Sequence, residues 1–409
     1  MKNLRFVLLI LTSLLLVNCK KEKPIVKCTT ESADINTDFE LVWTKNSNRN
    51  FLNINNVTVA PSSVIYNHNP NISVRNEELI AFNKANGDTL WQYTRGIWYQ
   101  TPQIFHDNYI VNIDGELVCI DAASGNEVWK LNKGYLSHFT IENGRIYAAF
   151  GDKRTNSDST QYYKITPSTG NETLLYSMHK SERNNRSQNP KGMRMWQHPN
   201  GNELLIIHSI SYINQVLNSY SEYYVLDLDG DSIYWDLGQY LISLEVTNPI
   251  VDNYFVYLHS TLGHIAKLNL LTKTEIWKTE SRPFTGSSKM IFANNLIYKS
   301  IGSQTGILRI HNTDDGGIYK KIGNTKILGR EQGLLNSNFR SYNNKIYFCN
   351  YNTLCVIDLL SNEVQNIINR SEKLDNLDSG EFAKSLDIDP STNYIYTERK
   401  GSIICLKEK

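Results

Sequence analysis

The 409-residue sequence lacks the motifs that identify most enzymes and metal sites. It has no CxxC pair and no two adjacent cysteines, so zinc ribbons and thioredoxin-type redox chemistry have no support. The HExxH, GxSxG, P-loop and GxGxxG patterns are also absent, and the nine histidines are scattered along the chain. These absences do not exclude a catalytic site that is assembled from residues far apart in the sequence.

The sequence also lacks a surplus of charge of either sign. It has 42 basic against 41 acidic residues, a net charge of +1, so it shows no electrostatic footprint for nucleic acid and no nucleic-acid partner is predicted. A mean hydropathy of −0.40 excludes a polytopic membrane protein. What the chain does contain is 11% aromatic residues, including 24 tyrosines, which suits many half-buried β-strands rather than disorder.

The cysteines give a loose indication of their chemistry. Cys349 and Cys355 flank a predicted turn, so a cross-strand disulfide and two buried thiols are both open, and the thiols are favoured.

The acidic run at 227–231 (DLDGD) alternates oxygen ligands as a calcium loop does. Its glycine comes too early for an EF-hand and the run coincides with a repeat turn, so we predict no metal. His208 and His259 lie on predicted strands and are expected to be structural.

The N-terminus has the features of an export signal. Lys2 and Arg5 precede an apolar run, Phe6–Val17, that is too short to span a bilayer. The run ends at Leu16-Val17-Asn18-Cys19, which resembles a bacterial lipobox. The resemblance implies a lipoprotein signal peptide at residues 1–18 and lipid attachment at Cys19, followed by a flexible tether at residues 19–38. An ordinary secretory signal with an incidental cysteine stays open as the alternative.

One residue indicates which membrane holds this lipid anchor. Lys20 follows the cysteine, whereas an Asp there commonly signals retention in the inner membrane of Gram-negative bacteria. We therefore expect a lipid-anchored outer-membrane protein, with its periplasmic or cell-surface orientation left open.

A short unit recurs through the rest of the chain. LIAFNKANGDTLW, at Leu79–Trp91, is a short apolar strand, a polar residue, a small turn and a second strand that ends in an aromatic. We call the polar residue the register residue, and it stands at Asn83, Asp121, Thr166, Asp227, Asn269, Asn312, Asp358 and Lys407. Its side chain can bond the backbone two residues further on and start the turn. Most spacings lie in the forties and, with strand-type patterning, indicate β-propeller blades of four strands.

The two ends of the chain complete the count of blades. Phe39–Trp43 reads as an outer strand with its aromatic but without an inner partner, and Gly401–Leu406 as an inner strand without an outer one. Pairing them makes an eighth blade and leaves no sheet edge exposed at the joint. Residues 39–409 are therefore predicted to form an all-β, eight-bladed β-propeller, closed by pairing the N-terminal strand with the C-terminal ones.

The repeat resembles the pyrroloquinoline-quinone-like (BamB-type) propeller repeat over roughly the whole of 39–409. That family includes quinoprotein dehydrogenases, the outer-membrane-assembly lipoprotein BamB and many uncharacterised propellers. The resemblance implies that the repeat tryptophans dock one blade onto the next, here Trp43, Trp91, Trp129, Trp235 and Trp277. The dehydrogenases stack their cofactor between a Trp and a disulfide of adjacent cysteines and hold calcium with Glu, Asn and Asp. No such cysteine pair exists here, so we predict no cofactor and no enzyme activity.

The individual part of the chain is the expanded fourth repeat. The stretch at 179–195 carries a local net charge of +4, and Trp196 follows it. Two interpretations stay open: a solvated loop, or a contact site for an acidic partner. The residues of that candidate contact site are Lys180, Arg183, Arg186, Lys191, Arg194 and Trp196.

Two functions follow from these features. The first is a non-catalytic outer-membrane scaffold that binds proteins, similar to BamB in fold, size and lipid anchor. The second is a cell-envelope module that binds a glycan or another nutrient through aromatics on the face of the ring. A quinoprotein-type dehydrogenase is the third and weakest reading.

Overall fold

A computed structural model of the chain describes residues 39–46, 56–68, 78–94, 100–151, 159–179, 181, 187–212, 219–238, 240, 248–260, 264–279, 290–300, 307–323, 339–349, 353–369, 382–399 and 402–409. The described residues form eight four-stranded antiparallel sheets and no α-helix. None of them builds a helix long and apolar enough to cross a membrane. The predicted signal peptide, Cys19 and the tether lie outside the described residues.

The 32 strands follow one another regularly along the chain. Blades 1 and 2 consist of β2 (Asn56–Val59), β3 (Ser63–His68), β4 (Glu78–Asn83), β5 (Thr89–Thr94), β6 (Gln103–Phe105), β7 (Asn108–Ile113), β8 (Glu116–Asp121) and β9 (Glu127–Leu131). Blades 3 and 4 consist of β10 (Leu136–Glu142), β11 (Arg145–Phe150), β12 (Ser159–Ile165), β13 (Glu172–His179), β14 (Ser187–Gln197), β15 (Glu203–Tyr212), β16 (Ser219–Asp227) and β17 (Ser232–Gly238). Blades 5 and 6 consist of β18 (Ile250–Asp252), β19 (Phe255–His259), β20 (Ile265–Asn269), β21 (Thr274–Lys278), β22 (Met290–Ala293), β23 (Leu296–Ser300), β24 (Ile307–Asn312) and β25 (Ile318–Gly323). Blades 7 and 8 consist of β26 (Arg340–Tyr342), β27 (Lys345–Cys349), β28 (Thr353–Asp358), β29 (Glu363–Asn369), β30 (Phe382–Asp389), β31 (Tyr394–Arg399), β32 (Ser402–Glu408) and β1 (Phe39–Asn46).

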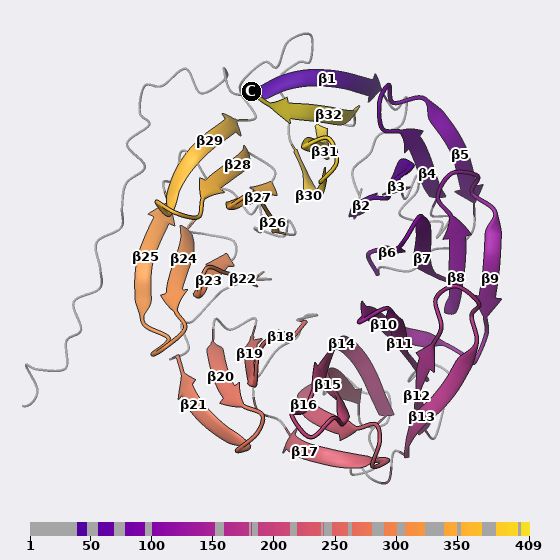
Figure 1. Ribbon diagram of the computed structural model, residues 1–409, viewed down its shortest axis with the longest axis vertical. Coiled ribbons are helices and arrows are strands. Elements are labelled where there is room, and N and C mark those ends of the chain that lie inside the picture. Colours follow the sequence, from indigo (N-terminus) through magenta and orange to yellow (C-terminus); the bar gives the residue numbers. More distant parts are fainter. Residues whose placement is uncertain are drawn as a thin grey trace, which may run out of the picture.

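The blades form a closed ring, with the first strand of each blade toward the centre and the fourth on the rim (Figure 1). Blade 8 joins the two ends of the chain, because β1 pairs antiparallel with β32 from Phe39 opposite Glu408 to Asn46 opposite Ser402. This confirms the predicted eight blades and their closure. The split blade ties the first and last strands together, so neither presents an open edge at the joint.

Asparagine and glycine turns start the second strand of most blades. Asn294 and Asn295 have φ of 48° and 57°, and Asn343 and Asn344 have 47° and 57°. Two consecutive positive φ values are the geometry of the tight hairpin turn that matches strand twist, which asparagine tolerates better than most residues. At the turn between the third and fourth strands, the register residue acts as predicted in blades 1, 4, 5 and 7: in blade 1, Asn83 Oδ1 accepts from the Ala85 N–H at 2.8 Å.

The apolar core lies between blades rather than within one body. Eight clusters of buried side chains are present among the described residues, such as the one that joins Leu79 and Ala81 of blade 1 to Val111 and Val118 of blade 2. We call the interface between neighbouring blades a junction and name it by the two blades, as in the 1/2 junction. Each blade buries a face only against its neighbour, as expected of a repeat too small to form its own core.

The disulfide alternative is not realised. Cys349 and Cys355 are both buried and not disulfide-bonded. They belong to different clusters, Cys349 with Leu354 and Cys355 with Ile357, on opposite faces of blade 7. Side chains on opposite faces of a sheet cannot be bridged without moving the backbone.

Candidate functional site

Four tryptophans make the same contact between neighbouring blades. Each indole N–H donates to the backbone carbonyl that follows the register residue of the next blade. The four bonds are Trp43 to Lys84 (2.8 Å), Trp91 to Ala122 (3.0 Å), Trp129 to Pro167 (2.7 Å) and Trp277 to Thr313 (2.9 Å). The structure therefore places these side chains in the packing between blades.

A glycine completes each of these contacts. Gly87, Gly125, Gly170 and Gly316 stand four residues after the register residue at φ between 68° and 74°. A Cβ on Gly125 would lie 2.6 Å from the ring of Trp91, and one on Gly316 would lie 2.6 Å from the ring of Trp277. The indole therefore lies directly over a backbone position that only glycine can occupy. We call the indole, the carbonyl and the glycine together the docking contact.

A β-bulge aims each docking indole. In blade 1, Ala81 pairs with Trp91 and Phe82 with Thr89, so Leu90 has no opposite residue. The same skip leaves Val128 and Ile276 unpaired, and these bulge residues are exposed on the rim. An extra residue in one strand re-aims the side chains next to it, and here it turns the tryptophan toward the next blade.

Trp235 departs from this arrangement. It packs against the core between blades 4 and 5, but the carbonyl of Leu270 accepts instead from the hydroxyl of Tyr234, at 3.1 Å. The position of the docking glycine in blade 5 is held by Lys273, at φ 55°. A side chain there leaves no room for an indole over the backbone, so the neighbouring tyrosine supplies the bond.

The basic stretch of the fourth repeat is only partly a loop. Lys191, Arg194 and Trp196 lie within β14, the innermost strand of blade 4. Arg194 forms an ion pair with Glu142 of blade 3 and donates to the Pro249 carbonyl of blade 5, so it links three blades. Lys180, Arg183 and Arg186 lie outside the described residues.

Trp196 requires a correction. Its side chain is 6% exposed and packs in the core between blades 4 and 5. An indole enclosed in this way offers no surface to a partner, so its assignment to a contact site is wrong.

The acidic turn and the two histidines have structural surroundings. Asp227 Oδ1 accepts the N–H groups of Asp229 and Gly230, as a register residue does. His208 stacks on Tyr223, with ring centroids 4.6 Å apart, and shares a 2.7 Å hydrogen bond with Ser221. His259 is buried in blade 5.

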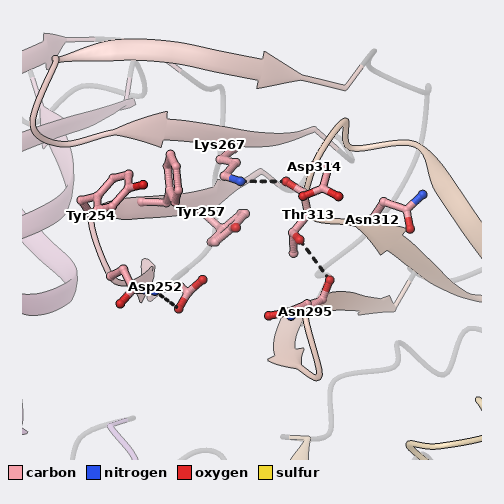
Figure 2. A pocket seen from close by; sticks show the side chains of 10 residues that line it. Asp252, Tyr254, Tyr257, Lys267, Asn295, Asn312, Thr313 and Asp314 are labelled. Carbon is pink, nitrogen blue, oxygen red and sulfur yellow. Dashed lines mark hydrogen bonds between the residues drawn. The ribbon is translucent and has the colours of Figure 1, made fainter.

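A pocket of about 310 Å³ opens at the 5/6 junction. Three turns line it: the β18–β19 turn with Asp252, Asn253 and Tyr254, the β22–β23 turn with Asn295, and the β24–β25 turn with Asn312, Thr313 and Asp314. Figure 2 shows these side chains around one space together with Tyr257 and Lys267. Sequence reasoning missed this pocket, because its residues come from two blades and are spread between positions 252 and 314.

Lys267 is the unusual residue of the pocket. It is 8% exposed, its ammonium donates to the Thr313 carbonyl at 3.0 Å, and it lies 4.0 Å from the ring centroid of Phe255. Aromatic faces attract such a cation. Lys267 is the residue opposite Trp277, and the residues opposite Trp91 and Trp129 are Ala81 and Cys119. A charged donor thus stands where those two blades hold an apolar side chain.

The pocket offers both donors and acceptors. Asp252 and Asp314 supply carboxylates, the three asparagines supply amides, and Lys267 supplies an ammonium. Burial and the nearby charge of Asp252 raise the pKa of Tyr257 to about 12, so its hydroxyl stays protonated. The arrangement suits binding of a small polar ligand.

A family model described as outer membrane protein assembly factor BamB matches residues 35–132 and 75–173, from β1 into blade 3. Over these residues, about a third of the chain, the repeats are similar to BamB-type, pyrroloquinoline-quinone-like propeller repeats. A comparison with curated proteins returned no match.

Solved structures with TM-scores above 0.5 share the fold at low sequence identity. Sqt1 from Saccharomyces cerevisiae is 9% identical with a TM-score of 0.63, and covers 91% of this chain and 100% of that chain. A europium-containing methanol dehydrogenase is 10% identical with a TM-score of 0.57, covering 88% and 84%. BamB from Moraxella catarrhalis is 14% identical with a TM-score of 0.45, covering 87% and 85%. An enzyme is among these structures, so the fold by itself does not select a function.

The described residues of this propeller lack the adjacent cysteine pair that the resemblance associates with a quinone site. The four described cysteines lie in blades 2, 7 and 8 and no two are adjacent. Four of the repeat tryptophans are engaged in docking contacts. Within the described ranges no group of three His, Cys, Asp or Glu side chains is placed to hold a metal ion.

Proposed function

We propose that the chain is a non-catalytic scaffold of the cell envelope that binds proteins, with a role in outer-membrane protein assembly. The observation that carries the proposal is the match to the BamB family model from β1 into blade 3. The poor fit of the described residues to a quinone site supports a binding role over the dehydrogenase reading. A rigid ring of docked blades also suits a scaffold, because binding residues act best on rigid elements.

The proposal includes a lipid anchor at Cys19 in the outer membrane. The lipobox-like Leu16-Val17-Asn18-Cys19 and the Lys20 that follows support it. Metabolic labelling with a clickable fatty acid tests it: the wild-type chain is expected to take up label and to sediment with outer membranes, and Cys19→Ala to do neither. Labelling that persists in Cys19→Ala would contradict the anchor.

The partner is sought by crosslinking in intact cells, followed by mass spectrometry. An outer-membrane barrel or assembly protein is the expected product. Charge reversal of Lys180, Arg183 and Arg186 to Glu tests the basic stretch, and Arg194 is spared because it pairs with Glu142. Lys130→Glu, an exposed residue on β9, is the matched control. Capture that is equal in both variants would remove the basic stretch from the interface, and capture of no envelope protein would contradict the scaffold.

A further inference from the structure

We propose that the pocket at the 5/6 junction binds a neutral saccharide, as a site separate from the scaffold's protein contacts. It lies on turns of blades 5 and 6, whereas the basic stretch belongs to blades 3 and 4. Its volume of about 310 Å³ falls at the lower end of small-ligand sites, which start near ~300 Å³. The ligand is therefore a short saccharide or the end of a longer one.

The polar lining matches sugar hydroxyls. Each hydroxyl donates one hydrogen bond and accepts others, so a sugar needs donors and acceptors side by side. The amides of Asn253, Asn295 and Asn312 provide both, Asp252 and Asp314 accept, and Lys267 donates. A purely apolar ligand would leave these groups without partners, which costs free energy on binding.

An aromatic side chain stands at the pocket in an exposed position. Tyr254 is 42% exposed on the β18–β19 turn, and its ring centroid lies 4.4 Å from that of Phe255 (Figure 2). The C–H face of a pyranose ring is apolar and can cover such an aromatic face, which removes apolar surface from water. A tyrosine combines this contact area with few rotatable bonds, so little entropy is lost when it is ordered.

The charges favour a neutral ligand. Asp252 and Asp314 face the same space as Lys267, so an anionic ligand meets two carboxylates and a cationic one meets an ammonium. Lys267 is also held by the Thr313 carbonyl and the ring of Phe255, which fixes its position. A neutral polyhydroxylated ligand bonds all three groups without repulsion.

The turns are ordered before any ligand arrives. Thr313 Oγ1 donates to the Asn295 carbonyl at 3.0 Å, and the Asn253 amide donates to Asp252 at 3.2 Å. The docking bond from Trp277 also holds the Thr313 backbone, at 2.9 Å. Such pre-organisation lowers the entropy lost on binding.

The test is a printed array of neutral and uronic-acid-containing oligosaccharides, probed with the full chain, followed by calorimetric titration of the best neutral probe. Tyr254→Ala and Asn295→Ala are expected to weaken binding about tenfold or more. Tyr319→Ala is the matched control, because Tyr319 is also 42% exposed but lies on the rim strand β25 outside the pocket. Thermal unfolding of each variant checks that the fold is intact.

The outcomes separate the alternatives. Retention of neutral probes that Tyr254→Ala loses and Tyr319→Ala keeps supports the proposal. Retention of acidic probes alone, lost in Lys267→Met, would show an anion site and overturn it. Retention of no saccharide at millimolar concentration, or equal binding by the pocket variants and the control, would also overturn it. None of these results depends on capture of a protein partner, so the scaffold proposal stands or falls separately.

Discussion

The 1/2 and 5/6 junctions share the same docking contact but bury different side chains beside it. At the first, Trp91 donates to Ala122 over Gly125; at the second, Trp277 donates to Thr313 over Gly316. The distances agree within 0.1 Å, and a Cβ on either glycine would meet the indole at 2.6 Å.

The side chains buried beside that contact differ between the two junctions. The 1/2 junction buries ten apolar residues, whereas the described residues of the 5/6 junction bury three, Tyr257, Ile265 and Ile297. The row Val111, Val118, Lys130 across blade 2 corresponds to the row Lys299, Arg309, Lys321 across blade 6. Docking therefore does not require an apolar junction, and one junction carries polar groups and a pocket. The first variant below places in the apolar 1/2 junction the type of residue, a lysine, that the 5/6 junction has at the same position.

The largest effect is expected when a lysine is placed in the apolar junction. Ala81 is fully buried at the position that corresponds to Lys267. We expect Ala81→Lys to lower the free energy of unfolding by about 3–5 kcal/mol, because the equivalent carbonyl, that of Ala122, already accepts from Trp91 and Ser63 and leaves the buried ammonium without a free acceptor. Urea unfolding measures it. Ala81→Met is the control for added bulk, at about 1–3 kcal/mol. Equal losses in the two variants would mean that bulk alone, not charge, distinguishes the junctions.

The docking glycines come next. Gly125→Ala and Gly316→Ala are each expected to cost about 2–4 kcal/mol, from backbone strain at positive φ and from the approach to the indole. Gly144→Ala is matched in φ, at 70°, but has open space around it, so we expect about 1 kcal/mol there. If the two substitutions lower the free energy of unfolding by very different amounts at Gly125 and Gly316, the side chains buried in a junction affect the strength of its docking contact.

These junctions show how much the sequence can reveal. Blade number and closure were predictable, because the register residues recur at a regular spacing and the end strands complement each other. The Trp–Gly pairing was also present as a signal: each docking tryptophan is followed in the next repeat by its glycine, and Lys273 stands in that place after Trp235.

Two features could not be predicted. The strand β14 cannot be told from a loop in the sequence, because an innermost strand carries polar residues: Gln188 and Asn189 are buried, and the Asn189 N–H donates to Ser209 Oγ. Hydropathy cannot separate such a strand from a polar loop. The pocket depends on three turns that only the stacking of two blades brings together. No local pattern records that proximity.

A pH dependence of stability sharpens the comparison further. Burial, followed by the neighbouring charge of Arg309, lowers the pKa of Lys299 to about 7, against 10.5 for a free lysine. Between these values the unfolded chain binds the proton and the folded chain does not, so stability rises with pH. We expect the free energy of unfolding to rise by about 1–3 kcal/mol from pH 7 to pH 9 relative to Lys299→Met, measured by urea unfolding. Parallel pH profiles of the two proteins would contradict the lowered pKa.

The smallest effect is expected when the lysine of the 5/6 junction is made apolar. Lys267→Met should change the free energy of unfolding by less than about 1 kcal/mol, because a buried charge is replaced by a side chain of similar length. The Thr313 carbonyl keeps its bond from Trp277, so no acceptor is left unsatisfied. Lys267→Glu is the contrasting variant and should cost several kcal/mol, since a carboxylate would face that carbonyl beside Asp252 and Asp314. A loss of more than about 2 kcal/mol in Lys267→Met would mean that the lysine supports the junction itself. The docking contact alone would then not stabilise a junction whose apolar core is small. A structural role would account for Lys267, and no ligand would be needed to explain why a lysine stands there.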